Sequence, residues 1–245
     1  MKLSKARFLL IAGLLIQSPA FTAPKYGPGV RALSVDSEAL RRNPSPDFWS
    51  LIPYYVSQQD SRSCSIASFS MMLNALDVSK GGRKAEDRLI DQKAFVKLML
   101  DLRPIERFFG RLIPGKTLSL EEFGTVAAEA LKRKGHGELK VEVIHAEGKG
   151  WKEKVEGALK SNELSSKDLI LANFLQSELT GDPEGKVGHV APVGAYDART
   201  GSVLILDPDR EYYEPYWVPV GIFLKGLETK DSDSGRNRGI LWIHP

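Results

Sequence analysis

Hydrophobic residues follow a helical spacing in the first half of the chain. In CSIASFSMMLNAL, residues 64–76, large apolar side chains recur every three or four positions, which predicts a buried helix. Residues 86–101 and 118–133 have the pattern of amphipathic helices, and Thr117 or Ser119 is a suitable N-terminal cap for the second of these. We therefore expect the first half to be mainly helical.

The pattern changes after residue 139. Apart from a predicted helix at 151–161, the second half contains short runs in which apolar residues either alternate with polar ones or are continuous. These predicted strands are 140–146, 168–175, 189–196, 202–207 and 239–245, with a turn at 197–200. Helices first and mostly hairpin-linked strands second favour an α+β fold over a doubly wound parallel sheet.

The first twenty residues have the pattern of a secretory signal peptide. Lys2, Lys5 and Arg7 precede the apolar run FLLIAGLLI at 8–16, and the small residues of SPA follow at 18–20. The apolar run is short for a membrane span, and the alternative interpretation is a buried N-terminal helix. We expect cleavage near residue 20 and export to the periplasm.

Three segments result from this interpretation. Residues 1–20 are the predicted signal peptide, and residues 21–45 are an extended arm with a short helix near 36–42. Residues 46–245 form the predicted catalytic domain, for the reasons given below.

Composition and charge exclude several classes of protein. Charged residues make up 27% of the chain and hydrophobic residues 42%, which is typical of a folded soluble protein and not of a disordered one. The formal charge of +3 falls to about zero once the basic signal segment is removed. We therefore expect no nucleic-acid partner and no membrane span in the mature chain.

Cys64 is the single cysteine of the chain, which excludes an intrachain disulfide and a zinc site built from cysteines. In an oxidising compartment cysteines are usually paired. An unpaired Cys64 is therefore a small buried hydrophobe, a thiol that pairs with another molecule, or a residue kept for its reactivity.

The position of Cys64 favours reactivity. It lies at the start of the predicted helix, where backbone N–H groups and the helix dipole stabilise a thiolate. Gln58 lies six residues upstream, and its amide could donate, with the Cys64 backbone N–H, to the oxyanion of an acyl-transfer intermediate. In isolation a cysteine in an apolar helix is more often a core residue.

His189 is the histidine best placed to act with this thiol. We expect His136 to be exposed in a charged loop, and His145 and His244 to be structural. His189 begins one predicted strand and Asp207 ends the next, so antiparallel pairing can bring them together. The carboxylate could then orient the imidazole while the other ring nitrogen faces a thiol.

Two segments carry a family resemblance. QQDSRSCSIASFSMMLNAL at 58–76 and GHVAPVGAYDARTGSVLILDPDREYYEPYWVPV at 188–220 resemble phytochelatin synthases, especially the short prokaryotic forms. TLSLEEFG at 117–124 is also similar to the family. The resemblance runs from about Asp47 to Ile243 and is loose between these segments.

The resemblance implies a papain-like cysteine proteinase fold, with an N-terminal helical lobe packed on a C-terminal antiparallel β-sheet lobe. It also implies cleavage of the Cys–Gly bond of glutathione through a γ-glutamylcysteinyl thioester. Water resolves the thioester to γ-Glu-Cys, or a second glutathione resolves it to a phytochelatin. Cys64 is then the nucleophile and His189 the general base and acid. Asp207 orients the histidine, and Gln58 is the oxyanion donor.

The resemblance also implies a site for the zwitterionic γ-glutamyl end of the substrate. Asp231 and Arg238 match positions that would bind its α-amino group and its α-carboxylate. Asn173 and Gly188 match positions that line the acyl site. Without the family, DSDSGRNRG would be interpreted as a solvated charged loop. The expected partners are glutathione and related γ-glutamyl thiols, and we also expect that the chain can form a homodimer.

Two departures from the family bear on the reaction. Ser65 stands where relatives usually have glycine, directly after the nucleophile. Gln176 stands where relatives usually have arginine, and the lost charge is expected to weaken binding of an acceptor glutathione. The resulting hypothesis is that hydrolysis outruns chain extension.

No tightly bound cofactor and no protein metal site are expected. We expect no cysteine-rich C-terminal region like that of the plant enzymes, since Cys64 is the single cysteine. Any dependence on cadmium or zinc would therefore arise from metal–glutathione thiolates that serve as substrate.

Two other functions remain open. A secreted papain-like peptidase would use the same four residues, but an internal peptide segment does not need the charges of Asp231 and Arg238. A non-catalytic module that binds thiols or peptides would keep the fold with an unreactive Cys64.

Overall fold

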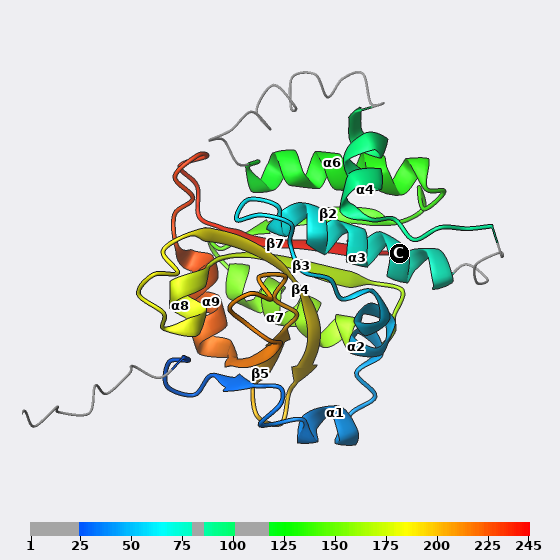
Figure 1. Cartoon of the computed structure of the whole chain (residues 1–245). Coiled ribbons are helices and arrows are strands. Elements are labelled where there is room, and N and C mark those ends of the chain that lie inside the picture. The colour runs from blue at the N-terminus through cyan, green and yellow to red at the C-terminus, as the bar shows by residue number, and fades with distance from the viewer. Residues whose placement is uncertain (1–24, 80–85, 101–117) are drawn as a thin grey trace, which may run out of the picture.

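The computed structural model describes residues 25–79, 86–100 and 118–245 (Figure 1). The predicted signal peptide, the first residues of the arm, Thr117 and residue 101 lie outside this part of the chain. The helices are α1 (Glu38–Arg42), α2 (Pro46–Leu51), the 3₁₀ turn η1 (Ile52–Tyr54), α3 (Cys64–Ser79), α4 (Gln92–Leu100), α6 (Leu120–Arg133), α7 (Trp151–Asn162), α8 (Gln176–Thr180) and α9 (Val220–Glu228).

One antiparallel sheet forms the centre of the molecule. Its strands are β1 (Arg31–Ala32), β2 (Lys140–His145), β3 (Leu169–Leu175), β4 (Gly188–Asp197), β5 (Ser202–Ile205), β6 (Tyr216–Pro219) and β7 (Gly239–His244). The strand order is β1-β6-β5-β4-β3-β7-β2, and every neighbouring pair is antiparallel. The predicted α+β class with an antiparallel sheet is confirmed.

The N-terminal helices cover one face of this sheet (Figure 1). Alternate strand residues such as Leu171, Leu204 and Leu241 point into a core shared with α2, α3, α4 and α6. Phe69 of α3 is fully buried there and stacks on Phe95 of α4 at 5.2 Å between ring centroids. This packing matches the predicted helical lobe on a sheet.

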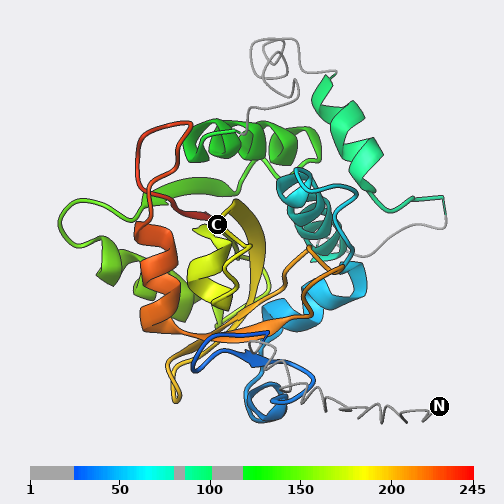
Figure 2. The same ribbon diagram turned by 60° about the vertical axis from the view of Figure 1, so that its left-hand side comes forward.

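A second helical layer covers the other face. The strand side chains that point to this other face pack against α7, α8 and α9; examples are Ile170, Phe174 and Ile205. Figure 2 shows α9 and α7 on the side of the sheet away from α3. The sequence pattern predicts α7 but not α8 or α9, since both begin directly at the end of a strand. The central strands β3 and β5 are therefore enclosed on both faces and apolar, whereas the edge strand β2 keeps exposed polar residues.

Local chemistry explains where α6 begins. Ser119 caps it and forms a capping box: its side chain accepts from the Glu122 N–H, and the Glu122 carboxylate accepts from the Ser119 N–H. In contrast, the predicted helix at 86–101 begins only at Gln92.

The prediction that His136 is exposed is wrong. Its side chain is buried, and Nε2 lies 3.0 Å from Oδ1 of Asp77, at the end of α3. The charged residues around it in sequence face the solvent, but the loop folds back on α3 and encloses the ring. Tertiary packing, which the local pattern does not report, sets this burial.

The arm docks against the C-terminal half of the chain. Gly27 donates to the Thr180 carbonyl, and its Cα lies so close to Gly181 that a Cβ on Gly181 would be 2.8 Å away. Gly181 also has a φ of 75°, which favours glycine. Further along, β1 pairs with β6 and α1 matches the predicted helix near 36–42.

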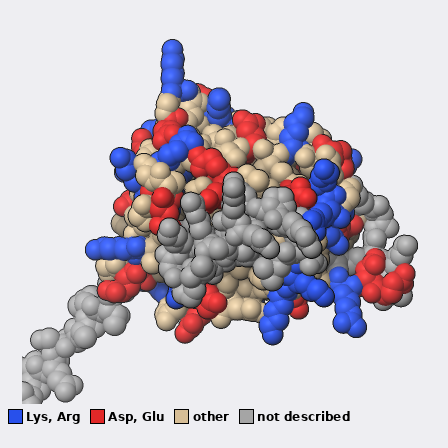
Figure 3. All heavy atoms as spheres, turned by 90° about the horizontal axis from the view of Figure 1, so that it is seen from above, with Lys and Arg blue, Asp and Glu red and all other residues tan. Residues whose placement is uncertain are grey.

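Charges of both signs are mixed on the surface over α6 and α4, the face seen in Figure 3. Among the described residues, no helix is long and apolar enough to cross a membrane.

Candidate active site

Cys64 is the first residue of α3 and is partly exposed. The turn before it is closed by Ser63, whose hydroxyl accepts from the N–H groups of Gln59 and Asp60 at 2.9 and 3.0 Å. One turn into the helix, the Ser68 hydroxyl donates to the Val190 carbonyl at 2.9 Å. This bond fixes the start of α3 beside β4, where His189 lies.

His189 and Asp207 meet across the sheet. The ring Nε2 of His189 lies 2.7 Å from Oδ1 of Asp207, and both side chains are buried. Asp207 follows β5 and lies diagonal to His189 on the neighbouring strand, because Pro192 accepts from Leu206 and sets the register. Phe174 of β3 holds the imidazole edge-to-face, with centroids 5.6 Å apart.

The Asp207 carboxylate receives several donors besides the histidine. The Tyr216 hydroxyl donates to Oδ2 at 2.8 Å, and the Asp209 N–H donates to Oδ1 at 2.9 Å. The Gln176 amide lies 3.5 Å from Oδ2. With these donors the carboxylate stays ionised although it is fully buried.

The three groups titrate together. Burial opposes charge on each, but the His189 imidazole lowers the pKa of the Asp207 carboxyl. Burial of the Cys64 thiol raises its pKa, yet the charge of His189 and its hydrogen bond to the sulfur more than offset this and lower it. The charges of Asp207 and Cys64 raise the pKa of His189 well above its ordinary value. Since Nε2 contacts Asp207, Nδ1 is the nitrogen left for the sulfur, and the arrangement favours a thiolate–imidazolium pair.

Gln58 lies on the loop that leads to Cys64. Its backbone N–H donates to the Pro208 carbonyl at 2.7 Å, and the Tyr55 hydroxyl donates to the Asp207 carbonyl at 2.5 Å. These two bonds join the segment before the cysteine to the segment that carries the aspartate. The Gln58 Oε1 atom is buried and has no hydrogen-bond partner among the described residues.

Arg238 is buried close to Gly188, one residue before the histidine. A Cβ on Gly188 would lie 2.7 Å from Nη1 of Arg238, so the guanidinium rests on the glycine backbone. Nη1 is also 3.3 Å from Oδ1 of Asn173 and 3.5 Å from Oδ1 of Asp231. Burial lowers the pKa of Arg238 despite the nearby Asp231 and Asp233. Its Nε has no partner in the described part of the chain.

All eight residues singled out from the sequence thus fall into two adjoining groups. Cys64, His189, Asp207 and the Gln58 loop form the first group, and Arg238 forms the second with the three residues around it, Asp231, Asn173 and Gly188.

Comparison with known proteins identifies the family. The sequence profile of the family described as phytochelatin synthase matches residues 31–240. The chain belongs to the phytochelatin synthase family. Glutathione gamma-glutamylcysteinyltransferase 2 of Arabidopsis thaliana is 29% identical to it over 211 residues, which are 84% of this chain and 42% of that protein.

Two further relatives have the same kind of name. Glutathione gamma-glutamylcysteinyltransferase 3 of Lotus japonicus is 29% identical over 222 residues, covering 84% of this chain and 39% of the relative. The fission yeast Schizosaccharomyces pombe glutathione gamma-glutamylcysteinyltransferase is 26% identical, covering 84% and 45%. The chain therefore spans less than half the length of these relatives.

Sequence reasoning missed several residues that hold the site of this phytochelatin synthase family member together. The Tyr216 hydroxyl donates to the Asp207 carboxylate, and the Tyr55 hydroxyl donates to the Asp207 backbone carbonyl. The Ser68 hydroxyl donates to the strand that carries His189. Tyr216 is opposite Ile205 in the β5–β6 pair, two residues from the aspartate. The predicted strands did not include β6, so no sequence signal gave this register.

No group of three or more His, Cys, Asp or Glu side chains is placed to hold a metal ion in residues 25–79, 86–100 and 118–245.

Proposed function

We propose that the chain cleaves the Cys–Gly bond of glutathione by cysteine-dependent acyl transfer. The support is the buried His189 between the Cys64 thiol and the Asp207 carboxylate. The buried Arg238 lies against Gly188, the residue before this histidine. The names of the relatives indicate γ-glutamylcysteinyl transfer from glutathione.

The Cys64 thiolate attacks the carbonyl carbon of the Cys–Gly bond. The oxyanion accepts hydrogen bonds from the Cys64 backbone N–H and from the side-chain NH₂ group of Gln58. The His189 imidazolium then donates its proton to the glycine nitrogen as the C–N bond breaks. Glycine leaves, and a γ-glutamylcysteinyl thioester remains on the sulfur.

The neutral His189 then acts as a base. It removes a proton from water, which yields γ-Glu-Cys, or from the amine of a second glutathione, which yields a phytochelatin. The thiolate is released in either case. Asp207 fixes the ring throughout, because it accepts from Nε2 and leaves Nδ1 toward the sulfur.

The γ-glutamyl end of the substrate needs one cation and one anion. Arg238 is the cation for the α-carboxylate, since its Nε has no partner within the described chain. Asp231, which contacts Arg238, is the anion for the α-amino group, and Asn173 and Gly188 lie against the guanidinium. An internal peptide segment carries neither charge, so this pair favours glutathione over a general peptidase substrate.

One observation carries the proposal: the Arg238 guanidinium packs on Gly188, the residue before His189. This contact joins the charged subsite to the nucleophile site. A γ-glutamyl carboxylate on Arg238 and a scissile carbonyl at Cys64 can thus belong to one small molecule.

The direct test is incubation with glutathione, followed by separation of glycine, γ-Glu-Cys and phytochelatins. Cys64→Ser should abolish glycine release, and His189→Ala should nearly do so. Intact mass should show a γ-glutamylcysteinyl adduct on Cys64. Wild-type turnover in both variants contradicts the mechanism, and a plain glutathione disulfide or no adduct supports a binding module.

A glycine pair tests the charged subsite. In Gly188→Ala the new methyl group meets the end of the Arg238 side chain at 2.7 Å, and this side chain can move without unfolding the protein. We expect the half-saturating glutathione concentration to rise about tenfold with an unchanged melting temperature. Gly157→Ala is the control, because nothing lies within 4 Å of its added Cβ. Equal glutathione dependence in both variants contradicts the assignment of Arg238.

We further propose that water outcompetes glutathione in the second step. Gln176 is buried beside Asp207 and carries no charge with which to bind an acceptor carboxylate. γ-Glu-Cys should therefore exceed phytochelatins in the product mixture. Gln176→Arg should shift the ratio toward phytochelatins, and a wild-type mixture dominated by long phytochelatins contradicts this hypothesis.

Three expectations extend the proposal beyond the site. Cadmium or zinc acts as a metal–glutathione thiolate substrate, so a chelator should change product formation only when metal has been added. The mature chain starts near residue 21 in the periplasm, which N-terminal sequencing of the exported protein tests. The homodimer is tested by the solution mass.

A further inference from the structure

The loop of residues 229–238 carries both charged residues of the proposed subsite. It is a narrow hairpin in which Lys230 bridges Asn237, and the Asp231 N–H donates to the Arg236 carbonyl at 2.8 Å. Asp231 also accepts from the Ser234 hydroxyl at 2.8 Å. Arg238 is the last residue of the loop and leads into β7. The position of this loop therefore sets where both charges lie.

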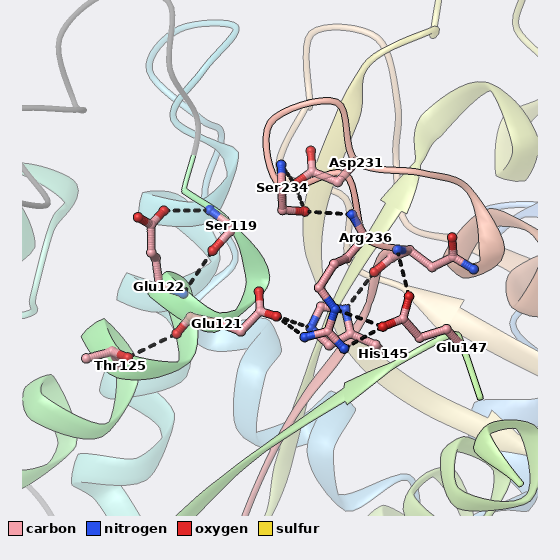
Figure 4. Close-up of polar contacts among 10 residues, drawn as sticks. Ser119, Glu121, Glu122, Thr125, His145, Glu147, Asp231, Ser234 and Arg236 are labelled. Atoms are coloured by element: carbon pink, nitrogen blue, oxygen red, sulfur yellow. Dashed lines mark hydrogen bonds and ion pairs between the residues drawn. The ribbon is translucent and has the colours of Figure 1, made fainter. Parts of the chain in front are cut away.

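Arg236 ties the loop to two other elements. Its guanidinium lies between Glu121, in the first turn of α6, and Glu147, which follows β2 (Figure 4). Nε donates to Oε1 of Glu147 at 2.8 Å, Nη2 contacts the same oxygen, and Nη1 donates to Oε1 of Glu121. One side chain thus connects the loop, α6 and the turn after β2.

Backbone contacts complete the attachment. The Asn237 side chain donates to the Ala146 carbonyl, and the Ala146 N–H donates to the Arg238 carbonyl, both at 2.8 Å. His145 Nδ1 lies 2.6 Å from the Asn237 carbonyl, while its Nε2 is 2.8 Å from Glu121. Glu121 therefore contacts both the loop arginine and the histidine that holds the loop backbone.

Opposite charges lie next to one another in this cluster. Hydrogen bonds from Arg236 and Asn237 lower the pKa of Glu147. Burial opposes the effect at Glu121, but its own backbone N–H and the nearby His145 and Arg236 lower the pKa there. A single exposed ion pair contributes little, but here one arginine serves two carboxylates in a network. The neighbouring Arg238 has a single, longer contact with an acid, 3.5 Å from Nη1 to Asp231, and its Nε has no partner among the described residues.

We infer that Arg236, held by Glu121 and Glu147, is a positioning residue that fixes the 229–238 loop so that Asp231 and Arg238 match the γ-glutamyl end of glutathione. This inference rests on the proposed function. Arg236 itself does not touch the substrate. Its loss should therefore weaken substrate binding and leave the chemical step intact.

The experiment measures single-turnover acylation of Cys64 over a range of glutathione concentrations. In Arg236→Met the half-saturating concentration should rise about three- to tenfold, while the limiting rate stays within about twofold. Arg236→Lys should recover part of the lost glutathione affinity. Lysine keeps the positive charge, but it lacks the planar guanidinium that binds Glu121 and Glu147 at once. Arg42→Met is the matched control, since Arg42 forms an exposed pair with Glu38 far from the loop in sequence.

The outcomes separate the two proposals. If wild-type protein forms no thioester, the proposed function fails. The inference about Arg236 is then decided by hydrogen exchange of residues 229–238 in the unliganded protein. Faster exchange in Arg236→Met than in Arg42→Met supports it, and equal exchange overturns it. If wild type is active, an unchanged half-saturating concentration in Arg236→Met, or a loss confined to the limiting rate, overturns it.

Discussion

Asp207 and Asp47 are both completely buried, but their surroundings differ in the number of donors. Asp207, behind the imidazole, accepts from His189, Tyr216 and a backbone N–H. Asp47, in the first turn of α2, accepts only from the Asn162 amide, and its Oδ1 has no partner among the described residues. Because both carboxyl groups are equally buried, the number of hydrogen-bond donors decides which of them is ionised.

The pKa values of the two carboxyls move in opposite directions. Burial opposes charge at Asp207, but the imidazolium and the other donors lower its pKa. At Asp47 burial dominates, the charges of Asp168 and Glu163 add to it, and the pKa rises to about 10. Asp47 is therefore protonated at neutral pH and Asp207 is ionised. A buried carboxylate becomes a functional group when the fold supplies donors and a cation.

The largest expected effect comes from Asp207→Asn. The amide keeps the shape but cannot stabilise the imidazolium or hold the ring in the same tautomer. We expect glycine release to fall about 10³–10⁴-fold. Asp197→Asn is the control: Asp197 is also buried with a lowered pKa, but its partners are the turn after β4 and Asn43 and not a histidine. A similar loss in both variants would point to general destabilisation.

Asp47→Asn should affect stability and not activity. We expect it to raise the free energy of unfolding and to leave glycine release unchanged. The folded pKa of Asp47 lies above its unfolded value, so folding takes up a proton between about pH 4 and 10. Wild-type stability is then lost as pH rises through this range, by up to about 1.4 kcal/mol per pH unit. The difference in unfolding free energy between the variant and wild type should grow from pH 5 to 8. A constant difference would mean that Asp47 does not bind this proton.

The contrast between these aspartates also marks what sequence can predict. Helix α3 and strands β3, β4 and β7 were predictable because the spacing of apolar residues within each segment encodes them. The meeting of His189 and Asp207 followed from hairpin-linked antiparallel strands, together with the family resemblance. These features depend on local pattern and simple connectivity.

Features that depend on register between distant segments were not predictable. Nothing in PSPDFWS indicates that Asp47 is buried against Asn162, a residue 115 positions away. The burial of His136 on α3 was missed for the same reason. The donors to Asp207 are likewise set by the pairing of β5 with β6 and by the loop before α3. The residues of the candidate site could be named from the sequence, but the residues that hold them in place could not.

The smallest expected loss of glycine release is that of Tyr216→Phe. This change removes one hydrogen-bond donor from Asp207, so the pKa of this carboxyl should rise slightly, in the direction seen at Asp47. Since His189 and the Asp209 N–H remain, we expect glycine release to fall only about three- to tenfold. The thiolate should also form at higher pH, because a less stabilised carboxylate supports the imidazolium less. Alkylation of Cys64 by iodoacetamide across pH measures this shift. Tyr213→Phe is the matched control: its ring packs on Tyr216 at 6.1 Å, but its hydroxyl donates to Asp182. If the two variants give the same alkylation profile, the hydroxyl of Tyr216 does not tune the Cys64 thiol, and the charge of Asp207 depends on His189 and the backbone alone.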